Sequence, residues 1–132
     1  MTVLVDTSVW VAHFRARHAA LVELLEADQA LTHPMVLLEL ACGTPPAPPA
    51  PPAPRARTLA ALGQLRQAAP SSTAEVMAFV ERERLYGLGC GLVDMTLLAS
   101  TLITPGARLW TLDRPLAALA RRFGIAHAVP MD

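Results

Sequence analysis

Residues 2–10 read TVLVDTSVW, and this stretch predicts a strand that runs directly into a helix. Residues 2–5 are short, apolar and rich in β-branched side chains, which favours a strand. Asp6 ends the strand, and Thr7 or Ser8 can begin a helix that we expect to run from Ser8 to about Arg15. Parallel α/β sheets place their functional sites at the carboxyl ends of strands, which is the position of Asp6.

The rest of the chain continues this alternation of strands and helices. We expect further helices over His18–Ala27, Pro34–Cys42, Arg55–Gln67, Thr73–Tyr86, Leu92–Ile103 and from Pro115 to about Phe123, and further strands over Ala30–Thr32, Leu109–Leu112 and Ala126–Val129. Such alternation implies a parallel sheet with right-handed crossovers, and therefore an α/β fold. The helix over Leu92–Ile103 is apolar nearly all round, so we expect it to be central and buried.

Length and proline content indicate how the chain is organised. With 132 residues, the chain suits one compact domain, and we expect a single domain over residues 1–132. Residues 44–54 hold seven of its 12 prolines, so the tract cannot be helical and should form an exposed polyproline II loop. A ligand for a proline-recognition module is one interpretation, but composition favours a loop expanded by a short repeat.

Composition and charge exclude some classes of protein. The formal net charge is zero, with 11 basic and 11 acidic residues, which argues against binding nucleic acid by bulk electrostatics alone. The hydrophobic content is 53%, yet no apolar run reaches the roughly 18 residues needed to cross a bilayer, and no export signal is visible. We therefore expect a cytoplasmic protein without membrane contact. Cys42 and Cys90 are too few for a disulfide framework, and we expect both to be buried thiols.

Four acidic residues lie beside apolar segments with no cation nearby in the sequence: Asp6, Glu39, Asp94 and Asp113. A carboxylate in low dielectric without a partner is costly, so a cluster of them suggests that a divalent metal supplies the missing charge. Helix capping could explain Asp6, Asp94 or Asp113 individually. Capping cannot explain Glu39, which lies inside a predicted helix where no residue three or four positions away can pair with it.

The residue types favour one class of metal. Oxygen ligands without a His or Cys cluster favour Mg²⁺ or Mn²⁺ over zinc. Such an ion can orient a water toward a phosphodiester and stabilise charge on the departing oxygen. The four histidines, His13, His18, His33 and His127, show no ligand spacing, so we assign none of them to the chemistry.

The segments that carry these acids resemble the successive motifs of PIN-domain ribonucleases. They are VDTSVW around Asp6, LEL around Glu39, GLVD followed by LLA around Asp94, and LWTLD ending at Asp113. More closely, the chain is similar to the VapC-type toxins of bacterial toxin–antitoxin pairs. The resemblance covers nearly the whole chain in the expected order, and it departs at the proline tract, where such toxins usually have a shorter connection.

The resemblance implies a doubly wound, three-layer α/β/α fold with a central parallel sheet. It also implies a metal-dependent endoribonuclease that acts on structured RNA such as tRNA or rRNA, forms a homodimer and is neutralised by a cognate VapB-type antitoxin. By the same resemblance, one or two Mg²⁺ or Mn²⁺ ions are held by Asp6, Glu39, Asp94 and Asp113, with the hydroxyls of Ser8 and Thr111 assisting.

Two other functions remain open at this stage. A noncatalytic module could keep the fold and bind RNA or a protein, and a metal-dependent phosphatase could use the same acids. The intact acidic positions disfavour the first, and the lack of an evident nucleophile motif or lid disfavours the second. Arg114, Arg121 and Arg122 could contact RNA phosphate near Asp113, or they could form a solvated helix face.

Overall fold

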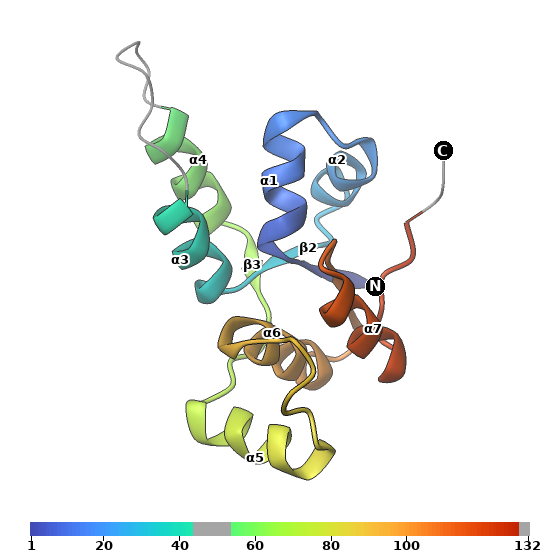
Figure 1. The fold of residues 1–132 in the computed structure, drawn as a ribbon. Coiled ribbons are helices and arrows are strands. Elements are labelled where there is room, and N and C mark those ends of the chain that lie inside the picture. Colours follow the sequence, from blue (N-terminus) through green and yellow to red (C-terminus); the bar gives the residue numbers. More distant parts are fainter. Residues whose placement is uncertain (44–53, 130–132) are drawn as a thin grey trace.

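The computed structural model describes residues 1–43 and 54–129 (Figure 1). Its elements in chain order are β1 (Thr2–Val5), α1 (Thr7–Arg15), α2 (Ala19–Glu26), β2 (Ala30–Thr32), α3 (Pro34–Gly43), α4 (Pro54–Gly63), β3 (Arg66–Gln67), α5 (Thr73–Glu83), α6 (Leu92–Ile103), β4 (Ala107–Trp110) and α7 (Arg114–Arg122). The strands form one parallel sheet in the order β3-β2-β1-β4. Helices cover both faces of this sheet, which confirms the three-layer α/β/α prediction (Figure 1).

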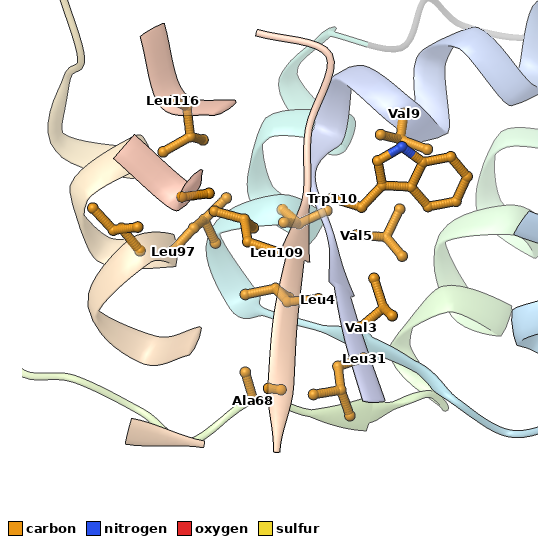
Figure 2. Packing of buried hydrophobic residues seen from close by; sticks show 14 of the residues in the cluster. Val3, Leu4, Val5, Val9, Leu31, Ala68, Leu97, Leu109, Trp110 and Leu116 are labelled. Carbon is orange, nitrogen blue, oxygen red and sulfur yellow. The ribbon is translucent and has the colours of Figure 1, made fainter. Parts of the chain in front are cut away.

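The central strand β1 is buried from both sides. Val3, Leu4 and Val5 are each 0% exposed, as expected for an interior strand of a parallel sheet covered on both faces. Figure 2 shows Val3 and Val5 on one side of the sheet and Leu4 on the other, where Leu97 of α6 also lies. Because apolar packing fixes the strand in this register, the residue that follows Val5 is held at the edge of the sheet.

The pairing of β1 with β4 brings two distant segments to the same edge. Val5 lies beside Trp110 in the parallel register, and the backbone N–H of Asp6 donates to the Trp110 carbonyl over 2.9 Å. Asp6 and Thr111 therefore follow neighbouring strands and lie next to each other, although 105 residues separate them. The carboxyl edge of the sheet is where the polar residues gather.

Helix α6 is the buried helix that the sequence predicts. All residues from 95 to 101 are buried, whereas Leu92 and Ile103 at its ends are exposed. The hydroxyls of Thr96 and Thr101 donate to the carbonyls four residues earlier, which satisfies these polar groups inside an apolar environment.

Several local predictions were wrong. The helix expected over Arg55–Gln67 ends at Gly63, and residues 66–67 instead pair with β2 as strand β3. Strand β4 covers 107–110 rather than 109–112, because the backbone turns after Trp110 toward the N-terminus of α7. The strand expected over Ala126–Val129 is reduced to one bridge between Ala126 and Leu109.

Three further predictions concern the cysteines, the proline tract and the membrane. Cys42 is exposed and Cys90 is only partly buried, so the prediction of two buried thiols was wrong. The polyproline prediction over 44–54 lies outside the described residues except for Pro54, which begins α4. Within the described ranges, no helix has the length and apolar character required to cross a bilayer.

Candidate active site

Four different elements bring the predicted acids toward the carboxyl edge of the sheet. Asp6 follows β1, Glu39 lies in α3, Asp94 is in the first turn of α6, and Asp113 is the N-cap residue of α7. The structure also places the hydroxyls of Ser8 and Thr111 at this edge, where both donate to Asp6.

Asp6 is the most buried of the four acids, at 5% exposed. Its Oδ2 accepts hydrogen bonds from the Ser8 and Thr111 hydroxyls, each over 2.7 Å. Asp6 does not cap α1 through its side chain, so the capping explanation fails for this residue. Among the described residues, no hydrogen bond reaches Oδ1, and this oxygen is therefore available to an external ligand.

Glu39 is exposed, and one of its oxygens is already oriented by the protein. The Thr7 hydroxyl donates to Oε1 over 2.7 Å, which links α3 to the start of α1. Thr7 is a site residue that sequence reasoning missed. Its signal was its place directly after Asp6, on the first turn of a helix that starts at the sheet edge.

Asp113 does cap a helix, which was the alternative to metal binding that the sequence left open for it. Its Oδ2 accepts from the Leu116 N–H over 3.0 Å, while its own N–H donates to the Thr111 hydroxyl over 3.0 Å. Asp94 makes only a long contact with the start of its helix, because the Gly91 N–H lies 3.4 Å from Oδ2. Helix capping therefore accounts for the contact of one Asp113 oxygen, but it engages the Asp94 carboxylate only weakly.

The acids influence one another electrostatically. Burial raises the pKa of the Asp94 carboxyl, and the negative charges of Asp113, Asp6 and Glu39 raise it further, although the Gly91 hydrogen bond opposes this. The closest group consists of Asp94, Asp113 and Cys90, whose ligand atoms lie within 4.8 Å of one another. Asp6 and Glu39 are outside this tight group but within electrostatic reach of Asp94.

Cys90 is the second residue that sequence reasoning missed. Burial, followed by the charges of Asp94 and Asp113, raises the pKa of its thiol to about 11. The thiol is therefore protonated at neutral pH and is not a nucleophile in this environment. No sequence pattern marks Cys90, because its approach to Asp113 depends on how α6 packs beside α7.

None of the ion pairs between described residues involves the four acids. Among the described residues, the ion pairs are Arg66 with Asp28 and Arg82 with Glu83, and neither lies at this site. The neighbouring carboxylates raise the pKa of Asp94. Together the four carboxylates form the oxygen-rich ligand set that hard divalent ions such as Mg²⁺ and Mn²⁺ prefer. The donor chemistry therefore fits such an ion.

The surface around the acids is open to a large substrate. Leu38, Leu92 and Leu112 lie one or two positions from Glu39, Asp94 and Asp113 in the chain, and all three are exposed. A hollow of about 350 Å³ between α5 and the start of α6 is lined in part by Cys90 and Leu92, so it adjoins the tight acidic group.

Of the three arginines considered for phosphate contact, Arg122 is already engaged. Its Nη2 donates to the Glu83 carbonyl over 3.2 Å, and its guanidinium lies over the Phe123 ring. Arg114 and Arg121 are both exposed, and Arg114 directly follows Asp113, so it is the better placed of these two for a phosphate near the acids.

Replacing Thr111 by valine is expected to reduce activity without unfolding the protein. Valine keeps the shape but removes the donor to Asp6 and the acceptor for the Asp113 N–H. Loss of such an orienting hydrogen bond typically costs about 10- to 100-fold in metal affinity or activity. Thr101→Val is the matched control, since that hydroxyl bonds only within α6. Unchanged cleavage by Thr111→Val would show that this hydroxyl does not orient the site.

Comparison with known proteins places the chain among relatives of known family. Residues 3–122 match the PIN domain family. The ribonuclease VapC32 of Mycobacterium tuberculosis, recorded from two strains, is 44% identical to this chain over 126 residues, which cover 96% of each protein.

Proposed function

This chain belongs to the PIN-domain family as a VapC-type ribonuclease, and we propose that it is a toxin that cleaves structured RNA, tRNA or rRNA, with Mg²⁺ or Mn²⁺. The observation that carries the proposal is the gathering of four acids: Asp113, Asp6 and Glu39 all raise the pKa of Asp94, and no ion pair between described residues involves any of the four. A site of this kind favours a divalent cation.

We assign a role to each acid. Asp6 and Asp94 are the main metal ligands, because Asp6 has an uncommitted Oδ1 and Asp94 has only one long hydrogen bond. Glu39 binds metal directly or through a water, held in place by Thr7. Asp113 serves a second ion with the oxygen that does not cap α7.

The hydroxyls position the acids for this chemistry. Ser8 and Thr111 both donate to Asp6 Oδ2, which fixes the carboxylate plane and leaves Oδ1 directed elsewhere. A divalent ion at such a site supplies a water of lowered pKa and stabilises negative charge on the phosphodiester oxygens.

The proposed partners follow from the same charge pattern. A cognate VapB-type antitoxin would block the site by placing a basic side chain among acids that have no cation of their own. We further propose that the protein acts in the cytoplasm as a homodimer. Exposed Arg114, beside Asp113, would offer the RNA a phosphate contact.

RNA cleavage by the purified protein tests the proposal. Wild type with Mn²⁺ is expected to cut cellular RNA at one or a few positions, which mapping of the new RNA ends would identify, and the cognate antitoxin should suppress the cuts. Asp6→Asn is expected to leave the RNA intact. Asp28→Asn is the matched control, because Asp28 is an exposed acid paired with Arg66 outside the site.

Two outcomes would reject the assignment. Equal cleavage by wild type and Asp6→Asn would show that these acids do not carry the reaction. Hydrolysis of a small phosphate ester without cleavage of RNA would indicate a phosphatase instead.

A further inference from the structure

His33 is a buried residue at the junction of two elements that carry the site. It follows β2 directly, precedes Pro34 at the first position of α3, and is 5% exposed. Its carbonyl accepts from the N–H groups of Val36 and Leu37, which places His33 at the N-cap of α3. Its ring Nδ1 accepts from the Met35 N–H over 3.0 Å, so the side chain also caps the helix.

This cap determines where the ring carries its proton. Because Nδ1 accepts a hydrogen bond from a backbone N–H, it has no proton of its own. The neutral ring therefore carries its proton on Nε2, which lies 3.2 Å from the Ser100 hydroxyl oxygen. The Nε2–H group of His33 donates to Ser100, which is 0% exposed.

The two hydrogen bonds connect the helices that carry two of the acids. His33 is fixed to the start of α3, and Glu39 lies six residues further along that helix. Ser100 lies in α6, six residues after Asp94. Ser100 is itself held, because its hydroxyl lies 3.4 Å from that of Ser71. The His33 ring is thus a buried polar link between α3 and α6.

We propose that His33 is a positioning residue whose two hydrogen bonds fix α3 against α6 and so set Glu39 relative to Asp94. This inference rests on the proposed function, since it takes both acids to hold metal. His33 itself touches neither acid and acts only through the helices. A residue that only capped α3 would need the hydrogen bond from Met35 alone. Positioning of the two helices also requires the hydrogen bond to Ser100.

The link depends on the neutral ring. Burial lowers the pKa of His33, and among the residues that the structure describes no charged side chain contributes to this shift. Protonation would place a hydrogen on Nδ1 and break the bond from Met35. The folded pKa lies below the ordinary value of 6.5, so the stabilisation is fully present above that pH and is lost as the pH falls through the lowered pKa.

Mn²⁺ binding to wild type and four variants at pH 7.5 separates positioning from capping. Ser100→Ala removes the link and leaves the cap, and His33→Asn keeps a capping oxygen but is too short to reach Ser100. Each is expected to weaken Mn²⁺ binding by about three- to tenfold, with the double variant no weaker than either single one. Thr101→Val, a buried hydroxyl of the same helix bonded to Leu97, is the control and should bind as wild type does.

A ¹⁵N spectrum of the histidine rings supplies a readout that does not depend on metal. Wild type is expected to show His33 as the neutral Nε2–H tautomer at pH 7.5, and a Nδ1–H tautomer would overturn the inference. Unchanged Mn²⁺ affinity in Ser100→Ala and His33→Asn would overturn it as well, while leaving the proposed function intact. Failure of wild type to bind Mn²⁺ at all would instead overturn the proposed function together with this inference.

Discussion

Replacing Asp94 by asparagine is expected to reduce RNA cleavage by at least about 10²–10³-fold, the usual cost of removing one electrostatic stabiliser from an active site. Asparagine keeps the size of the side chain and an oxygen that can accept from Gly91, but it removes the negative charge that favours a divalent ion. Cleavage rates at saturating Mn²⁺ measure this loss, with Asp28→Asn as the control for an acid outside the site.

The same substitution should leave the metal-free protein at least as stable as wild type. Burial and three neighbouring carboxylates raise the pKa of Asp94, so the folded state favours its protonated form. The corresponding contribution to stability is fully present below the unfolded value near 3.8 and is lost as the pH rises through the folded pKa. At pH 7, the ionised Asp94 therefore lowers the free energy of unfolding of wild type, and the neutral asparagine does not.

Thermal melts in EDTA at pH 7 and pH 4 measure this difference. The advantage of Asp94→Asn over wild type should be larger at pH 7 and shrink at pH 4, where the wild-type carboxyl is more protonated. A clear loss of stability at pH 7 would mean that Asp94 has a structural role. Retained cleavage would mean that it is not a metal ligand.

Removal of divalent metal is expected to abolish cleavage and to lower the melting temperature of wild type. An ion that binds only the folded state stabilises it by about 2.7 kcal/mol when its concentration is one hundred times the dissociation constant. Dialysis against EDTA followed by stepwise addition of Mn²⁺ should restore both properties over the same concentration range. In Asp94→Asn, neither cleavage nor the melting temperature should change over this range of Mn²⁺ concentration. Full cleavage by wild type in EDTA would exclude a metal-dependent reaction.

Much of the fold could be predicted from local sequence. Residues 2–5 predict β1 because an apolar β-branched run ends at a polar residue, and the apolar content of residues 92–103 predicts the burial of α6. Strand β3 could not be predicted in this way. Arg66 and Gln67 are polar and exposed, and they form a strand only because Leu31 and Thr32 of β2 offer them backbone partners.

The site could be predicted in part. An acid after an apolar strand, as at Asp6, and an unpaired acid inside a helix, as at Glu39, are visible in the sequence. The contacts that orient the acids are not, because they join residues far apart in the chain: Thr7 reaches Glu39 across 32 positions, and Thr111 reaches Asp6 across 105. The role of His33 depends in the same way on Ser100, 67 residues away.

Geometry also decided between explanations that the sequence left open. Asp6 and Asp113 could each have been a helix cap, and both stand at a helix N-terminus. Only Asp113 caps with its side chain, whereas the Asp6 carboxylate accepts from the hydroxyls of Ser8 and Thr111 and makes no side-chain cap of α1. The donor to Asp113 is a backbone N–H, and the donors to Asp6 are side-chain hydroxyls.

Anomalous scattering from a crystal grown with Mn²⁺ tests the central claim most directly, since it locates the ion itself. We predict a peak in contact with carboxylate oxygens of both Asp6 and Asp94, with Glu39 and Asp113 beside it. The same experiment on Asp94→Asn should show no peak there. A wild-type crystal in saturating Mn²⁺ without a peak among these acids would contradict the account.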